Sequence, residues 1–207
     1  MKPQDIEKRS FEIITAELGE RTFPAGIAEV VKRVIHTTAD FDYADSLAFS
    51  PDVIKKAKAA LAAGATVVTD TNMVLSGVSK VTLAKLGGKA VCLMADEQVA
   101  IEAKARGVTR AVVSMEHAAK FEGPLIFAIG NAPTALIRLH ELIAEGIVAP
   151  ALVIGVPVGF VNVVEAKELF IGGDTPYIIA RGRKGGSNVA ASIVNALLYQ
   201  MVHREGF

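Results

Sequence analysis

The sequence predicts an α/β fold in which a parallel or mostly parallel sheet is covered by helices on both faces. Short apolar runs rich in β-branched residues alternate with longer segments of helical pattern, which is typical of strands joined by crossover helices. The 207 residues are 51% hydrophobic and only 21% charged, which is enough apolar material for one substantial core. Because no linker or internal repeat divides the chain, we expect a single domain over residues 1–207.

The first informative element is a helix expected over residues 26–36. Its apolar side chains follow the i, i+3, i+4, i+7, i+8 spacing of one buried helical stripe: Ile27, Val30, Val31, Val34 and Ile35. Arg33 and His36 lie on the opposite face, together with Glu29 and Lys32. His36 is therefore expected to point away from the core on which its own helix packs.

His36 has the surroundings of a general acid. It lies in the last turn of this helix, near the negative end of the helix dipole, and Asp40 and Asp42 follow closely. Both features favour the protonated imidazolium, which suits proton transfer near neutral pH. Arg33, one turn earlier on the same face, is placed to anchor an anionic substrate group. The competing interpretation is that the pair belongs to an ordinary solvated helix face.

The strands are expected in six short runs: residues 66–69, 90–94, 111–113, 125–129, 151–154 and 177–179. Several runs end in polar or glycine-rich turns: residues 70–72, 95–96, 114, 130–134 and 155–159. Because ligands of open α/β sheets bind outside the carboxyl ends of the strands, these turns, with Asn131 among them, are predicted to form the wall of the site. Asp70 and Asn72 either contact a ligand there or cap the helix that begins near Met73.

The turn at residues 183–188 leads into the last apolar helix. It carries a basic cluster without acidic neighbours in the sequence: Arg181, Arg183 and Lys184. Together with the helix dipole and the backbone N–H groups of Gly185, Gly186 and Ser187, these side chains are suited to hold carboxylates. Ser187 is also a good N-cap residue in the absence of any ligand.

Composition excludes several classes of function. The 22 basic and 22 acidic residues cancel, so the field that would attract nucleic acid or an anionic membrane is missing. We find neither a targeting segment nor a run that approaches the ~20 apolar residues of a membrane span, and we expect a cytoplasmic protein. Cys92 lies in an apolar run, and the histidines are too widely spaced to assemble a metal site. No dinucleotide fingerprint or Walker A motif supports a nucleotide-dependent enzyme.

Side by side, these motifs resemble those of the precorrin isomerase family, also called precorrin-8X methylmutases or, for cobalt-bearing substrates, cobalt-precorrin-8 methylmutases. The similar segments run through nearly the whole chain in the order of the family: residues 6–14, 33–38, 70–74, 130–136, 155–161 and 182–190. Two positions depart from the usual pattern. Thr38 and Ala39 stand where Ser-Gly is frequent, and Ala166 stands where the family often has serine.

The resemblance implies a three-layer α/β/α fold with a mostly parallel sheet, in a homodimer whose active sites lie near the subunit interface. It also implies an intramolecular transferase of cobalamin biosynthesis, which moves a methyl group from C-11 to C-12 of a corrin-type tetrapyrrole to give hydrogenobyrinate or its cobalt analogue. By the same resemblance His36 donates and accepts the proton, and Ser10 and Arg33 contact the substrate. We add Thr37, beside His36, to the expected contacts.

The implied chemistry needs few groups. A 1,5-sigmatropic methyl shift requires neither electron transfer nor a nucleophile, so that protonating the ring and holding its geometry is sufficient. We therefore expect no redox or metal cofactor. The acetate and propionate groups of the tetrapyrrole would be bound by Arg33, Arg183, Lys184 and the turn amides. The alternative class is a tetrapyrrole-binding carrier, which would share an anion-binding pocket but have no use for a titrating His36.

Overall fold

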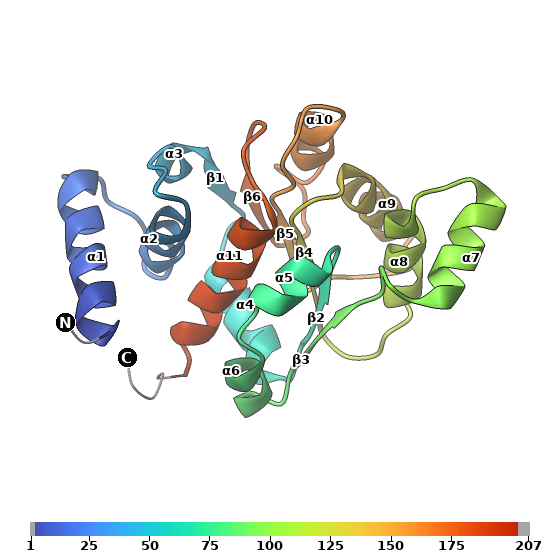
Figure 1. The fold of residues 1–207 in the computed structure, drawn as a ribbon, viewed down its shortest axis with the longest axis horizontal. Coiled ribbons are helices and arrows are strands. Elements are labelled where there is room, and N and C mark those ends of the chain that lie inside the picture. Colours follow the sequence, from blue (N-terminus) through green and yellow to red (C-terminus); the bar gives the residue numbers. More distant parts are fainter. Residues whose placement is uncertain (1–2, 203–207) are drawn as a thin grey trace.

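The computed structural model describes residues 3–202 and is built on one mixed sheet (Figure 1). In chain order its strands are β1 Leu47–Phe49, β2 Thr66–Thr69, β3 Lys89–Cys92, β4 Leu125–Ile129, β5 Leu152–Gly155 and β6 Tyr177–Ala180. Across the sheet the order is β1-β6-β5-β4-β2-β3. All neighbours are parallel except β1, which runs antiparallel to β6 with Leu47 opposite Ala180. The prediction of a mostly parallel sheet is confirmed.

Helices cover both faces of this sheet (Figure 1). One layer contains α1 Pro3–Leu18, α2 Ile27–Thr38, α4 Val53–Ala62, α5 Asn72–Gly77, α6 Lys80–Lys85 and α11 Ser187–Tyr199. The other contains α7 Glu97–Arg106, α8 Arg110–Ala118, α9 Pro133–Ala144 and α10 Val163–Glu168, while the short α3 Tyr43–Ser46 leads into β1. The predicted three layers are therefore present.

The central strands are buried on both faces. In β4, Ile126 and Ala128 pack into the core shared with α2 and α11, whereas Phe127 and Ile129 pack into the core shared with α8 and α9. Successive side chains of a strand point to opposite faces, so a strand between two helical layers must be apolar at every position. This is why the central strands are read from the sequence as continuous apolar runs.

Two strand assignments differ from the prediction. Residues 111–113 are not a strand but lie in α8, which begins after Thr109, whose Oγ1 accepts the N–H of Val112. Ser114 is consequently inside that helix and fully buried, not in a turn at the edge of the sheet. The prediction also lacks β1, because three residues are too short to show a period and this strand exists through its pairing with β6.

Helix α2 has the predicted amphipathic form and a strained end. Its stripe residues Val30, Val31, Val34 and Ile35 are buried. The helix closes at Ala39, which adopts the left-handed conformation with φ 54° and donates its N–H to the Ile35 carbonyl at 2.7 Å. Glycine adopts this conformation without a Cβ penalty. Ala39, with its Cβ, therefore carries strain at this position.

Replacing Ala39 with glycine should therefore stabilise the protein. The left-handed conformation costs a non-glycine residue about 1–2 kcal/mol, partly offset by the greater freedom of glycine in the unfolded chain, so we expect a net gain of roughly 0.5–1 kcal/mol. Urea unfolding monitored by circular dichroism measures the change. Ala144→Gly, at an exposed position in right-handed α9, is the control and should lose stability. A loss in both variants would show that Ala39 is not strained.

Candidate active site at the carboxyl edge of the sheet

His36 lies at the end of α2 with its side chain exposed, as the helical pattern predicts. Its ring stacks on Phe11 of α1, with ring centroids 5.2 Å apart and an interplanar angle of 19°. The Arg33 guanidinium lies over the same Phe11 ring at 4.7 Å and over the Tyr199 ring at 5.2 Å. It also donates a hydrogen bond to the Glu7 carboxylate. Helix α1 thus supports both predicted functional side chains of α2.

Two smaller hydroxyl side chains complete this helix pair. Ser10, half-buried on α1, donates to the Ile6 carbonyl at 3.0 Å. Thr37, exposed beside His36, donates to the Arg33 carbonyl at 2.9 Å. Both hydroxyl groups make the local bond to the preceding turn that is common for serine and threonine in helices, and each keeps its oxygen as an acceptor.

The Asp70 carboxylate holds the turns at the carboxyl ends of β2 and β4 together. It is fully buried and accepts three backbone N–H groups, from Gly130 at 2.9 Å and from Asn131 and Ala132 at 2.7 Å each. Burial raises the pKa of this carboxyl above its usual value although the three N–H groups act in the opposite direction. The helix-cap interpretation of Asp70 and Asn72 is wrong, because Thr71 caps α5 by accepting the N–H of Val74.

Backbone segments approach one another closely beside Asp70. A Cβ at Gly130 would lie 2.7 Å from the Cα of Ser187, and a Cβ at Gly185 would lie 2.1 Å from the Val156 carbonyl oxygen. The Gly186 N–H donates to that same oxygen at 2.8 Å. Glycine is therefore required at 130 and 185 by direct contact, and the predicted turns after β2, β4, β5 and β6 do come together.

Ser187 takes a different role from the predicted cap. It is the first residue of α11, and its Oγ is 2.9 Å from the Oγ1 of Thr71. Gly186 occupies the cap position with φ 134°. The hydroxyl pair links the start of α11 to the start of α5. Asn72 and Asn131, in contrast, are exposed at the turns that Asp70 and Thr71 hold in place.

The segment at residues 181–186 brings Lys184 to the turn that follows His36. Lys184 Nζ lies 2.6 Å from a carboxylate oxygen of each of Asp40 and Asp42. This contact holds the pKa of Asp40 below its usual value and raises that of Lys184. Arg181 also lies 3.8 Å from Glu168. Two residues of the basic cluster, Arg181 and Lys184, thus have acidic partners that are distant in the sequence.

Arg183 differs from the other two basic residues of this segment. Its side chain is exposed, it makes no ion pair with any residue between 3 and 202, and its guanidinium lies 5.5 Å from the centroid of the Phe160 ring. Phe160, 82% exposed, and Val161, 78% exposed, belong to the turn after β5. A guanidinium held against an aromatic face keeps its N–H groups available for a carboxylate.

Phe11 and Lys167 also belong to this edge, although neither is among the predicted site residues. Lys167, on α10, is fully buried, and its Nζ donates to the carbonyls of Gly182 at 2.7 Å and Lys184 at 2.8 Å. Burial lowers the pKa of this lysine to about 8. A lysine in a short helix is normally exposed. A phenylalanine on an N-terminal helix is normally part of the core. Sequence patterns therefore assign neither Phe11 nor Lys167 to a site.

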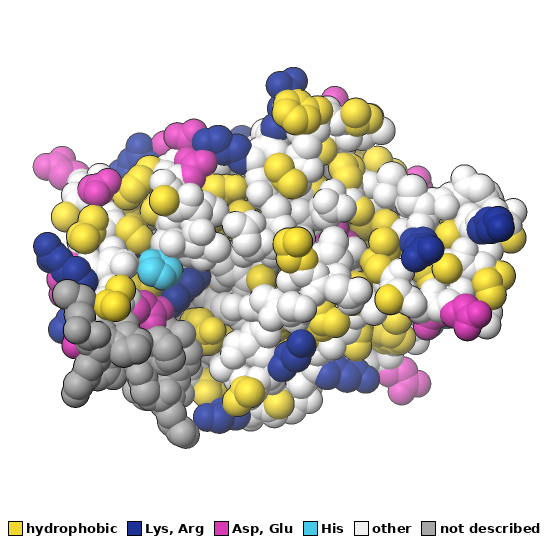
Figure 2. Space-filling model, viewed as in Figure 1, with side chains coloured by type: hydrophobic (Ala, Val, Ile, Leu, Met, Phe, Trp, Pro, Cys, Tyr) yellow, Lys and Arg dark blue, Asp and Glu magenta, His cyan; other side chains and the backbone are white. Residues whose placement is uncertain are grey.

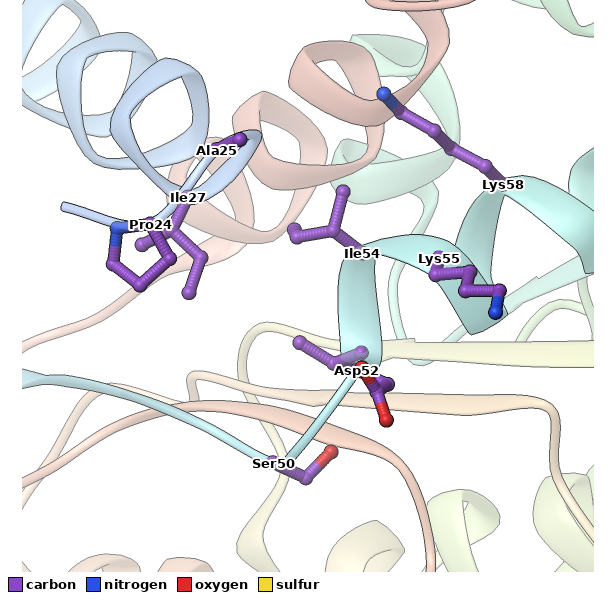
Figure 3. Close-up of a pocket in the computed structure, with 9 residues that line it drawn as sticks. Pro24, Ala25, Ile27, Ser50, Asp52, Ile54, Lys55 and Lys58 are labelled. Atoms are coloured by element: carbon purple, nitrogen blue, oxygen red, sulfur yellow. The ribbon is translucent and has the colours of Figure 1, made fainter.

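A cavity of about 450 Å³ lies at the other end of α2 (Figure 3). Pro24 and Ile27 face Ile54 of α4 across it, with Ser50 and Asp52 at its base. Ile27 is separated from His36 by about 14 Å along the helix axis, at 1.5 Å per residue. This cavity is therefore distinct from the group of residues around His36.

Within residues 3–202 no group of three or more His, Cys, Asp or Glu side chains is arranged to hold a metal ion, and no described helix is long and apolar enough to cross a membrane.

The arrangement of strands and turns matches that of a solved protein. The structure of the precorrin-8X methyl mutase from Thermus thermophilus aligns with a TM-score of 0.85, covering 93% of this chain and 95% of that chain at 38% identity. The family model described as precorrin-8X methylmutase matches residues 5–200. The chain belongs to the precorrin-8X methylmutase family.

Precorrin-8X methylmutase relatives match along almost the full chain. The cobalt-precorrin-8 methylmutase of Priestia megaterium is 46% identical over 95% of this chain and 88% of its own length. That of Salmonella typhimurium is 45% identical over 97% of this chain and 96% of its own length. The precorrin-8X methylmutase of Pseudomonas aeruginosa is 40% identical over 94% of both chains. The chain is thus an isomerase of the methylmutase type in cobalamin biosynthesis, as the sequence resemblance predicts.

In this methylmutase, Asp70→Asn should be strongly destabilising. The asparagine amide retains one acceptor oxygen and turns an NH₂ group toward buried N–H donors, so we expect a loss of about 2–3 kcal/mol in the free energy of unfolding. Denaturant unfolding measures it. Asp52→Asn, at an exposed residue whose side chain makes no cap hydrogen bond, is the matched control and should change stability by less than about 0.5 kcal/mol. Equal effects of the two substitutions would contradict the role given to Asp70.

Gly185→Ala should displace the segment before α11. The added Cβ would meet the Val156 carbonyl oxygen at 2.1 Å, and since both atoms belong to backbone, relief requires the segment to move, at a cost on the order of 2–4 kcal/mol. Thermal unfolding and limited proteolysis report the change. Gly173→Ala is the control, because its Cβ would make ordinary contact at 3.5 Å with the Phe170 carbonyl. A Gly185→Ala variant as stable as this control would refute the close approach.

Proposed function

We propose that the chain moves a methyl group from C-11 to C-12 of precorrin-8X or cobalt-precorrin-8, giving hydrogenobyrinate or cobyrinate, with His36 as general acid and base. The observation that carries the proposal is the placement of His36. It is exposed at the end of α2 and stacked on Phe11. The turn that follows it is tied by Lys184 to the segment that presents Arg183. An ionisable group thus faces outward next to a place that suits an anionic ring.

The position of His36 favours proton transfer to a ring system. The last turn of a helix stabilises a positive charge through the helix dipole. The flat face of Phe11 adds a cation–π attraction and fixes the plane of the imidazole. A proton delivered to the conjugated ring system promotes the methyl shift, and its return restores the enzyme. Because the shift is intramolecular, the remaining task of the protein is to hold the ring.

Arg183 is the best-placed side chain for the acetate and propionate groups of the substrate. It is exposed and, among the described residues, makes no ion pair, whereas Lys184 is already engaged by Asp40 and Asp42 and Arg33 by Glu7. A planar guanidinium binds a carboxylate in a bidentate manner. We assign the remaining ring contacts to Ser10, Arg33, Thr37, Asn72, Asn131, Lys184 and the amide of Gly185. The expected contact from the amide of Gly186 is wrong, because its N–H already donates to the Val156 carbonyl. Asp70 and Ser187 support these contacts from buried positions.

We further propose a homodimer, active in the cytoplasm, in which the second copy covers part of this edge. The most exposed large apolar side chains of the described chain include Met73 at 71%, Phe160 at 82% and Val161 at 78%. Figure 2 shows hydrophobic side chains gathered next to basic ones at the rim of the molecule near α10. Phe160 and Val161 adjoin each other, and exposed apolar side chains that lie together are typical of a surface that another molecule covers. A flat macrocycle enclosed between two subunits would also be shielded from solvent.

The deciding experiment follows the visible absorption of precorrin-8X, with and without cobalt, mixed with the protein. Wild type should convert the substrate, because the ring chromophore changes when the methyl group moves. His36→Ala should still bind but convert at least 100-fold more slowly, in keeping with the usual contribution of a general acid. The rate constants are taken from single-turnover traces.

His117→Ala is the matched control, since His117 lies on α8 in the opposite helical layer and pairs with Glu102. It should convert substrate at the wild-type rate. Equal conversion by His36→Ala would remove His36 from the mechanism. Binding without conversion by wild type, for both substrates, would instead identify the protein as a tetrapyrrole carrier.

A further inference from the structure

Lys167 is a buried cation without a carboxylate partner among residues 3–202. It is fully enclosed, and its ammonium donates only to two backbone carbonyls, those of Gly182 at 2.7 Å and Lys184 at 2.8 Å. Burying a charge is costly unless it is paired or well hydrogen-bonded, and an apolar side chain of the same length would avoid that cost. The presence of an ammonium here requires an explanation other than packing.

The two carbonyls flank Arg183. The carbonyl of Arg183 itself accepts the Gly159 N–H at 3.2 Å, so three successive carbonyls, at 182, 183 and 184, are all engaged from the protein side. With these oxygens held inward, the side chains of Arg183 and Lys184 are left exposed. Lys167 supplies two of the three contacts that fix this orientation.

The same segment is connected to the end of α2. The ammonium of Lys184 contacts Asp40 and Asp42 at 2.6 Å each, and these residues follow His36 closely in the chain. A continuous series of contacts therefore runs from Lys167 through residues 182–184 to the turn beside His36. Burial lowers the pKa of Lys167 to about 8, which leaves it mostly protonated at pH 7.

We propose that Lys167 is a positioning residue of the active site: its ammonium holds residues 182–184 so that Arg183 presents its charge to the carboxylates of the tetrapyrrole while Lys184 stays paired with Asp40 and Asp42 beside His36. The inference rests on the proposed function for the identity of the ligand. It assigns Lys167 no contact with the substrate and no part in proton transfer. A lysine that merely filled the core would be replaceable by methionine without effect on substrate binding.

The first test is Lys167→Met, which replaces the aliphatic stem by an unbranched apolar side chain of similar length and removes the donors. We expect KM for the precorrin substrate to rise about tenfold while kcat stays within about threefold of wild type, because uniform binding is lost and His36 is retained. Amide hydrogen exchange of residues 181–186 should accelerate at least tenfold, whereas exchange in β4 and β5 should not change. Lys104→Met, at an exposed position on α7, is the control and should match wild type in all three measurements.

Lys167→Gln provides the second test. Its amide keeps N–H donors but is neutral and one bond shorter, so KM and local exchange should fall between those of wild type and Lys167→Met. This variant also decides the question if Lys167→Met unfolds globally, which would appear as fast exchange throughout the sheet. An unchanged KM together with unchanged exchange at 181–186 in a folded Lys167 variant would overturn the inference. Absence of turnover by wild type would overturn the proposed function instead, and the exchange data would still report on whether Lys167 holds the segment.

Discussion

The carboxyl edge of the sheet depends on the enclosure of the Asp70 carboxylate by backbone N–H groups. Three donors from residues 130–132 converge on it, and the turn so formed lies against the start of α11, where Gly130 permits contact with Ser187. Buried polar groups must be satisfied, so the ends of β2 and β4 are fixed relative to each other. The position of the segment that carries Arg183 follows from this, because Gly185 and Gly186 rest on the turn after β5.

The elements that the sequence predicts well are those buried on both faces. β4 has the predicted bounds because each of its residues faces a helical layer and is apolar. Residues 111–113 show the limit of this reasoning, since a short β-branched run fits one face of a helix equally well, and the cap at Thr109 decides the outcome. Patterns of apolar residues do not predict β1, because this strand forms by pairing with β6.

In the site, local signals predict the outward face of α2 and the turns at the carboxyl edge. What they do not predict are partners distant in the chain. Lys184 and Asp40 are 144 residues apart, and Thr71 and Ser187 are 116 residues apart. Nothing in the residues around Lys167 distinguishes it from the many exposed lysines, because its burial arises from the packing of α10 under residues 182–184. From the sequence alone, Asp70 is predicted to be a helix cap or a ligand contact. Its hydrogen bonds to the backbone N–H groups of residues 130–132 appear only in the structure.

The antiparallel pairing of β1 with β6 has a consequence for the order in which the protein acquires its activity. α2 can form early from local interactions, whereas β1 gains its partner only when the last quarter of the chain is in place. Joining segments so distant in the chain is slow compared with helix formation. A growing polypeptide on the ribosome therefore completes α2, with His36 at its end, long before it contains the segment at residues 181–186 that packs beside the turn after His36.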